Sequence, residues 1–205
     1  MTAMSKRQWR KALRSLHEGQ DVRNAQSSLL CRHILQSESY KRARVVACYV
    51  SMSHEADVTE ILQDVLRSGK ILALPLCETP PHMTLRRVDS LDALIPGAYG
   101  IPEPPTDAPV IPMQEVDLIL VPLEGIDARG YRLGKGGGYY DHLLAHADGL
   151  TIGCALSWQR VECLPREEWD IPLKACADWQ GLYMFNNNDT GKEQNDGREE
   201  EQAED

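Results

Sequence analysis

The sequence predicts an α/β protein whose sheet is mostly parallel and covered by helices, and three observations lead to that prediction. Short apolar segments alternate along the chain with longer segments of helical periodicity. One apolar segment, "VDLILVPL", is so uniformly apolar that we expect a strand buried on both faces, as in parallel sheets. No apolar run approaches the roughly 20 residues of a membrane-spanning helix, so these segments belong to a folded core.

The elements expected in the first half are two helices, a strand and a third helix. Two long helices fit within residues 5–38, and the apolar segment at 43–52 follows as a buried strand. A helix at 58–69 then presents one apolar face and ends at Gly69. The side chains of that face are Val58, Ile61, Leu62, Val65 and Leu66.

The second half continues the alternation of strands and helices. A helix is expected at 139–147, and a connection rich in proline and glycine occupies 96–112. One α/β domain should therefore cover residues 1–185. The strands of this half are expected at 71–77, 116–123 and 150–156.

The formal net charge of −9 is unevenly distributed along the chain. Residues 186–205 contain eight acidic and two basic residues without an apolar period, so we expect a disordered acidic tail. An acidic protein is a poor general binder of nucleic acid, and we expect no nucleic-acid partner. By contrast, the first seventeen residues hold five basic residues and no acidic one, which suits a small polyanion.

The cysteines and the N-terminal segment indicate a compartment. Six cysteines are scattered without a C-x-x-C pair, which suits reduced thiols rather than a disulfide framework. The basic N-terminal segment lacks the continuous apolar stretch of a secretory signal. We therefore expect a cytoplasmic protein with no membrane partner.

A glycine-rich run, "RLGKGGGYYD", extends from Arg132 to Asp141, after a buried strand and at the start of an expected helix. Glycines at such a place let backbone N–H groups turn toward an anion, and a helix N-terminus adds a favourable dipole. Arg132 and Lys135 add positive charge, so the run predicts a phosphate site. It is not a P-loop, and Tyr139 replaces the third glycine of the dinucleotide fingerprint.

The aspartate that ends this run adds a metal ion to the prediction. A carboxylate beside a phosphate would repel it unless a divalent cation lay between them, and Mg²⁺ prefers one or two carboxylates together with phosphate oxygens. Asp141 therefore predicts a cradle for Mg²⁺ and a nucleotide. The alternative is a tight glycine-rich turn followed by an aspartate in the first turn of a helix.

The longer segment "DLILVPLEGIDARGYRLGKGGGYYD" closely resembles the signature of the 5-formyltetrahydrofolate cyclo-ligase family. Three other segments resemble the same family in the same order: "KRQWR", "GAYGIPEP" and "LPREEWDIPL". The resemblance extends over residues 5–185. It implies a monomer with a fold like that of the sugar-isomerase and CoA-transferase group. It also implies the conversion of 5-formyltetrahydrofolate and ATP to 5,10-methenyltetrahydrofolate, ADP and phosphate with Mg²⁺, in a catalytic domain at 1–185.

The resemblance carries over to individual residues. Lys6 and Arg10 are four apart, so they share a helical face, and they match the family motif for ATP phosphates; the alternative is a solvated basic face. The implied ATP-binding residues are Lys6, Arg10, Arg132, Leu133, Gly134, Lys135, Gly136, Gly137, Gly138, Tyr139 and Tyr140. Those implied for the folate substrate are Val50, Glu55, Lys135, Gly136, Gly137, Gly138 and Tyr139. Asp141 and Asp170 are implied for Mg²⁺.

Several of these assignments have plainer alternatives, and neighbouring residues are expected to be structural. Glu55 is otherwise an ordinary loop acid, and Asp170 is otherwise an acid that ends a helix before Pro172. The residues expected at solvated or surface positions are Arg7, Lys11, Arg14 and His54. Those expected to pack against other side chains are Trp158, Trp169 and Trp179.

The implied reaction needs no side-chain nucleophile, and the sequence shows no evident Ser–His–Asp or Cys–His arrangement. The formyl oxygen would attack the γ-phosphorus of ATP, and N10 would then close the ring as phosphate leaves. Two alternatives are a non-catalytic module that binds a nucleotide or a folate, and a sugar-phosphate isomerase on the same fold. The isomerase would need a general acid/base pair and no ATP.

Overall fold

The computed structural model describes residues 4–97 and 100–185, so the acidic tail expected at 186–205 lies outside the described residues. Its helices are α1 Lys6–Ser15, α2 Gln20–Gln36, α3 Glu38–Arg42, α4 Thr59–Arg67 and α5 Tyr139–Leu144, with short 3₁₀ turns η1 Leu91–Ala93, η3 Met113–Glu115 and η4 Ser157–Gln159. The strands of the main sheet are β1 Val45–Ala47, β2 Ile71–Cys77, β3 Met83–Val88, β6 Val110–Ile111, β7 Leu118–Val121, β10 Leu150–Cys154, β11 Ala175–Ala177 and β12 Leu182–Met184. Two small hairpins pair β4 Ile95–Pro96 with β5 Pro102–Glu103, and β8 Gly125–Ile126 with β9 Arg132–Leu133.

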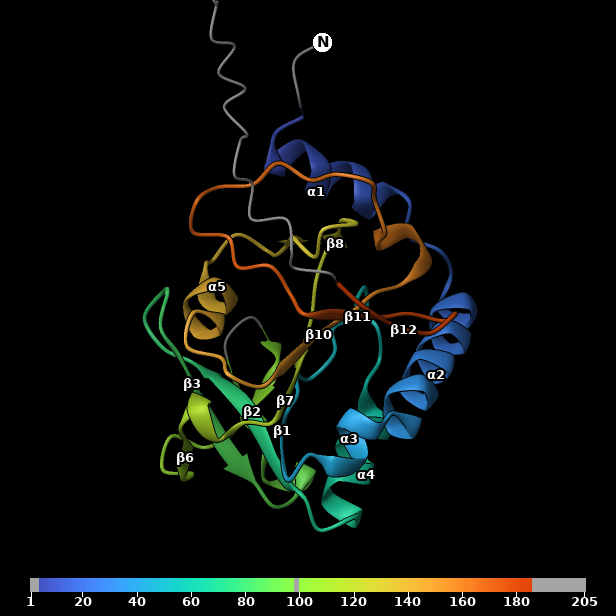
Figure 1. Ribbon diagram of the computed structural model, residues 1–205. Helices are drawn as coiled ribbons and strands as arrows, with labels where there is room; N and C mark the ends of the chain where they lie inside the picture. Colours follow the sequence, from blue (N-terminus) through green and yellow to red (C-terminus); the bar gives the residue numbers. More distant parts are fainter. Residues whose placement is uncertain (1–3, 98–99, 186–205) are drawn as a thin grey trace, which may run out of the picture.

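The eight strands of the main sheet lie in the order β12-β11-β10-β7-β1-β2-β3-β6 (Figure 1). The five strands from β11 to β2 are parallel to their neighbours. The three remaining strands pair antiparallel at the two edges. The predicted fold class, α/β with a mostly parallel sheet, is therefore confirmed.

The two faces of the sheet are covered differently. Alternate residues of a strand point to opposite faces, so Val46 of β1 packs in one core cluster and Val45 and Ala47 in the other. Helices α2 and α4 bury Ile34, Ile61 and other apolar side chains in the first cluster; burial of one such side chain contributes roughly 1.5–3 kcal/mol. In Figure 1 α2, α3 and α4 lie together on one side, and α5 lies on the other side, where its leucines join the second cluster.

Helix α1 stands apart from both faces and lies at the end of the molecule near β8 (Figure 1). Leu13 of α1 packs with Leu133 and Leu164 in a small third cluster. A Cβ atom at Gly125 of β8 would lie 2.6 Å from Cδ1 of Leu13, so the absent side chain allows this close packing. As a result, the basic face of α1 approaches the loops that follow the parallel strands.

Most expected elements are present, with shorter ends. The strand expected at 71–77 coincides with β2, whereas β1, β7 and β10 are shorter than their apolar segments. The helix expected at 139–147 ends at Leu144 as α5. Strand β3 was not expected. Among the described residues, no helix combines the length and the apolar character needed to cross a bilayer.

Candidate active site

A cavity of about 800 Å³ opens at the carboxyl ends of β1, β2 and β7, where ligands bind in open α/β sheets. Residues from the loops after these strands line it, among them Glu55 after β1, Pro81 after β2 and Glu124 after β7. Every residue that the sequence analysis assigned to ATP, folate or Mg²⁺ is on its lining. These residues are Lys6, Arg10, Val50, Glu55, Arg132, Leu133, Gly134, Lys135, Gly136, Gly137, Gly138, Tyr139, Tyr140, Asp141 and Asp170.

Two parts of the lining differ in composition. We call one the charged wall; it consists of the loop Gly134–Gly138 with Lys6, Arg10, Arg132, Asp141 and Asp170. We call the other the apolar wall; it consists of Leu74, Pro75, Cys77, Met83, Ile101, Pro102 and Glu103. The first comes from α1, the glycine run and the segment before β11, and the second from β2, β3 and the β4–β5 hairpin.

The glycine run forms the loop between β9 and α5. Gly136 and Gly138 have φ angles of 103° and 72°, in the left-handed region that favours glycine, and Gly138 is the N-cap of α5. Glycine is therefore required at these two positions by the backbone path. Helix α5 has only six residues, so its dipole is small and the positive charge of the loop comes from side chains.

Helix α1 closes over the charged wall through Lys6 and Arg10. Nζ of Lys6 lies 2.6 Å from Oδ2 of Asp170 and 2.8 Å from Oε2 of Glu167, and Nε of Arg10 donates to the carbonyl oxygen of Gly134 at 2.7 Å. Burial alone would lower the pKa of Lys6, but its hydrogen bonds with Asp170 and Glu167 outweigh this effect and raise it. Lys6 is therefore a charged group held at the cavity, and it is not part of a solvated face.

The two aspartates proposed for Mg²⁺ both line the cavity, and the residue after Asp170 contacts Asp141. Oδ1 of Asp141 is 3.0 Å from Nη2 of Arg132, and it accepts a 3.4 Å hydrogen bond from the backbone N–H of Ile171, the residue after Asp170. Burial lowers the pKa of Arg132, whose side chain is 3 % exposed, although the charge of Asp141 opposes this.

This pair of aspartates fits Mg²⁺ only together with a nucleotide. Within residues 4–97 and 100–185, no three histidine, cysteine or acidic side chains are grouped to hold a metal ion. Two carboxylates completed by phosphate oxygens and water are a set that Mg²⁺ accepts, so the residues present fit a metal that arrives with a phosphate ligand.

Glu55 is buried between the two walls, with 3 % of its side chain exposed. Its Oε1 lies 2.7 Å from Nζ of Lys135, and its Oε2 accepts a 2.9 Å hydrogen bond from the backbone N–H of Met52. Both carboxylate oxygens therefore have protein partners already.

Two expectations about neighbouring residues were wrong, and a third was incomplete. Arg14 is exposed, as expected for a solvated face, but it also donates to both oxygens of Glu124 at 2.7 and 3.0 Å, a bidentate pairing suited to the planar guanidinium. His54, expected at the surface, is only 28 % exposed, with Nε2 3.4 Å from Glu124. Trp169, expected to pack, is 66 % exposed and lies on the cavity lining, in a segment without helix or strand.

Glu124 itself was not predicted from the sequence. Its carboxylate is 4 % exposed and lies between Arg14 and His54. Burial alone would raise the pKa of Glu124, but the nearby His54 ring and the hydrogen bonds from Arg14 outweigh it and lower the pKa to about 2. Because Arg14 is one turn after Arg10, this pair anchors α1 beside the cavity.

The chain is similar to known proteins in both sequence and structure. Residues 2–177 match the model of the 5-formyltetrahydrofolate cyclo-ligase family. The Escherichia coli K12 5-formyltetrahydrofolate cyclo-ligase is 34 % identical over 139 residues, which are 65 % of this chain and 76 % of that protein. The mouse enzyme of the same name is 29 % identical over 174 residues, 78 % of this chain and 85 % of that protein. The solved structure of Aquifex aeolicus 5,10-methenyltetrahydrofolate synthetase superposes with a TM-score of 0.80 at 33 % identity and covers 97 % of each chain.

Proposed function

Because this chain belongs to the 5-formyltetrahydrofolate cyclo-ligase family, we propose that it converts 5-formyltetrahydrofolate and ATP to 5,10-methenyltetrahydrofolate, ADP and phosphate, with Mg²⁺. One observation carries the proposal: a single cavity joins a glycine-rich loop with basic side chains to an apolar wall. A reaction between the phosphate of a nucleotide and a reduced pterin needs both surfaces in one site.

The charged wall would bind the triphosphate of ATP. Backbone N–H groups of Gly134–Gly138 and the side chains of Lys6, Arg10 and Lys135 would donate to phosphate oxygens. In the structure Lys6 is paired with Asp170 and Lys135 with Glu55. Binding would exchange these internal partners, since phosphate oxygens replace a carboxylate at each ammonium group.

The reaction would proceed in two steps. The formyl oxygen attacks the γ-phosphorus, and the bond between that phosphorus and the ADP oxygen breaks, which leaves a phosphorylated formyl group. N10 then attacks the formyl carbon, the carbon–oxygen bond breaks, and phosphate leaves as N10 loses its proton. The cationic side chains of the charged wall would stabilise the charge that develops on the transferring phosphoryl group.

Mg²⁺ would be held by Asp141 and Asp170, and when bound it would supply positive charge next to the phosphates. Arg132, buried behind Asp141, would orient that carboxylate. On the substrate side, Val50, Glu55 and Tyr139 would contact the reduced pterin. No side chain has to act as a nucleophile.

One assay tests the proposal against its two alternatives. The purified chain is incubated with 5-formyltetrahydrofolate and Mg·ATP, and ADP and the absorbance of the methenyl product are followed together. We expect equal amounts of both, and none after chelation of Mg²⁺. An inert binding module would bind either ligand without product. A sugar-phosphate isomerase would act on its substrate without ATP and leave 5-formyltetrahydrofolate unchanged.

A further inference from the structure

Glu103 differs from every other carboxylate that lines the cavity in the described part of the chain. Each of the others has a basic partner: Glu55 has Lys135, Glu124 has Arg14, Asp141 has Arg132, and Glu167 and Asp170 share Lys6. Glu103 is 7 % exposed and has no basic side chain of residues 4–97 or 100–185 within ion-pair distance. Glu103 is therefore a buried carboxylate of the apolar wall that has no basic partner in the described part of the chain.

The fold holds this carboxylate in one place. Glu103 lies in β5 opposite Ile95 of β4, and a Cβ atom at Gly97 would come within 2.4 Å of Cγ of Glu103. Any side chain at position 97 would push Glu103 aside. The thiol of Cys77 lies beside the Glu103 carboxylate. Its pKa is raised to about 11, mainly by burial and further by the negative charge of Glu103 and the hydrogen bond between the two side chains. A thiol is a weak donor, so Glu103 keeps acceptor capacity for a ligand.

The chemistry of the two proposed ligands decides which one Glu103 would meet. A buried carboxylate without a cation is costly unless hydrogen-bond donors reach it. ATP would bring phosphates, which repel a carboxylate, whereas a reduced pterin brings an amino group and ring N–H groups. Glu55, the other buried acid near this wall, has protein partners on both oxygens until ATP draws Lys135 away, so without ATP it offers the pterin no free oxygen. The free acceptor positions are those of Glu103.

We propose that Glu103 is a second pterin-binding carboxylate, which accepts hydrogen bonds from the N–H groups of the reduced pterin and so helps to select the folate substrate. This inference rests on the proposed function, because it takes the pterin of 5-formyltetrahydrofolate as the ligand of the apolar wall. It assigns Glu103 to substrate binding and leaves phosphate binding to the charged wall.

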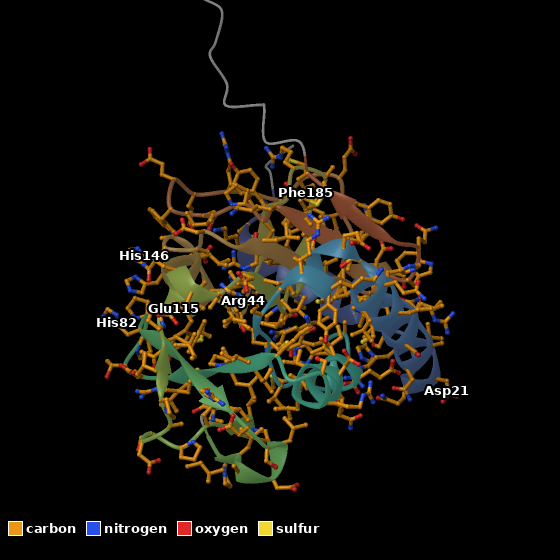
Figure 2. All side chains as sticks on the ribbon, turned by 60° about the horizontal axis from the view of Figure 1, so that its bottom comes forward. Asp21, Arg44, His82, Glu115, His146 and Phe185 are labelled. Carbon is orange, nitrogen blue, oxygen red and sulfur yellow. The ribbon has the colours of Figure 1, made fainter. Side chains whose placement is uncertain are left out.

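The test is the affinity of Glu103→Gln for each ligand alone, measured by isothermal titration calorimetry. Glutamine keeps the shape that Gly97 accommodates but removes the charge and one acceptor. We expect the affinity for 5-formyltetrahydrofolate to fall roughly 10- to 100-fold, as for lost hydrogen bonds to a charged group. The affinity for Mg·ATP should change less than about twofold. Glu115, labelled in Figure 2, is an exposed acid that does not line the cavity, so Glu115→Gln is the control and should bind both ligands like the wild type.

A second variant keeps the negative charge of Glu103 but changes the position of its carboxylate. Gly97→Ala should displace the Glu103 side chain and weaken 5-formyltetrahydrofolate binding without weakening Mg·ATP binding. Far-UV circular dichroism and melting temperature establish that each variant is folded, and Gly97→Ala carries the test if Glu103→Gln does not fold. Wild-type folate affinity in both variants, or an equal loss for ATP, overturns the role of Glu103 while the wild-type assay still yields methenyl product. A wild type that neither binds 5-formyltetrahydrofolate nor forms product overturns the proposed function as well.

Discussion

The charged wall and the apolar wall of the cavity differ in whether their acidic side chains have basic partners. On the charged wall Lys6 pairs with Asp170 and Arg132 pairs with Asp141, so the positive and negative charges of these pairs cancel. On the apolar wall Glu103 has no cation among the described residues. On the charged wall these ion pairs are complete without a ligand, and Arg10 is held by a carbonyl oxygen, whereas the carboxylate on the apolar wall has no cationic partner.

This difference determines which kind of ligand each wall can bind. An ion pair within the protein can be exchanged for an ion pair with phosphate or metal, because each charge keeps an opposite partner throughout. An isolated buried carboxylate gains only when a donor arrives, so it suits an uncharged ring with N–H groups. Changes on one wall should therefore alter the affinity for one ligand and spare the other.

The largest expected effect comes from the basic residues of α1. Replacement of both Lys6 and Arg10 by glutamine should raise the Michaelis constant for ATP by roughly 100-fold or more, since each charge-assisted hydrogen bond contributes roughly 1.5–3 kcal/mol. The constant for 5-formyltetrahydrofolate should hardly change. Steady-state kinetics with each substrate varied in turn measures both values.

The matched control lies on the same helix. Arg7 and Lys11 are exposed and do not line the cavity, so their replacement by glutamine should leave both Michaelis constants unchanged and stability within about 0.5 kcal/mol. If the Lys6, Arg10 variant behaves like this control, the charged wall does not bind ATP through α1.

The next effect concerns the metal. Asp141→Asn should lower turnover roughly 100-fold, because a well-placed metal contributes several kcal/mol to transition-state stabilisation. It also removes the counter-charge of Arg132, which is 3 % exposed, so the free energy of unfolding should fall by roughly 3 kcal/mol.

Asp170→Asn separates these two consequences of the Asp141 variant. Lys6 would still pair with Glu167, so this variant should lose turnover at limiting Mg²⁺ without a comparable loss of stability. Urea unfolding and a Mg²⁺ titration of activity test both. Wild-type Mg²⁺ dependence in folded forms of the two variants would remove these aspartates from the metal site.

The central strands and the family were predicted well because both are indicated by short contiguous stretches of sequence. The apolar runs of β2, β7 and β10 are visible without any knowledge of what packs against them. Likewise, the glycine run is a contiguous motif, and the family match confirms the resemblance that it suggested. Strand β3 was missed because Arg86 and Arg87 interrupt its apolar pattern.

The acids and bases of the site were harder to predict because their surroundings come from distant segments. Glu124 looks like a loop acid, and its partner Arg14 is 110 positions earlier in the chain. Glu103 is buried by a small hairpin, and nothing in its local pattern indicates that the side chain turns inward. Burial of a carboxylate depends on tertiary contacts, which short motifs do not encode.

A smaller effect is expected at Glu124, which lines the cavity and pairs with Arg14 of α1. Its pKa is lowered to about 2 in the folded protein from an ordinary value of 4.5, so the ionised form stabilises the fold above about pH 4.5. This contribution should be lost as the pH falls from 4.5 to 2. At neutral pH we expect Glu124→Gln to lower the free energy of unfolding by roughly 2 kcal/mol, after allowance for the exposed Arg14.

The measurement is urea unfolding of both proteins between pH 7 and pH 3. The difference in unfolding free energy should shrink toward acid pH, because the wild-type carboxylate is progressively protonated. A difference that is constant with pH would mean that the Glu124 charge does not stabilise the fold.

The smallest expected effect tests whether the backbone of the glycine run matters to ATP or only to folding. Gly138 has a φ angle of 72°, and a Cβ atom there would meet only Cβ of Pro81, at 3.6 Å. Gly138→Ala therefore adds no clash and only the cost of a left-handed conformation, about 1 kcal/mol. If the loop keeps its backbone conformation, the free energy of unfolding falls by this roughly 1 kcal/mol. If the loop changes its conformation instead, its backbone N–H groups turn away from the phosphates. We expect a loss of ATP affinity of about fivefold.

Gly69 is the matched control, because it has a φ angle of 74° at the end of α4, does not line the cavity and has no atom within 4 Å of its Cβ position. Gly69→Ala carries the same backbone cost far from either wall, so its melting temperature should fall like that of Gly138→Ala while ATP affinity stays at the wild-type value. Calorimetric melting and ATP titration of the two variants give the comparison. Equal ATP affinities in both variants would show that the left-handed glycine serves the fold alone, and phosphate binding on the charged wall would then depend on its side chains.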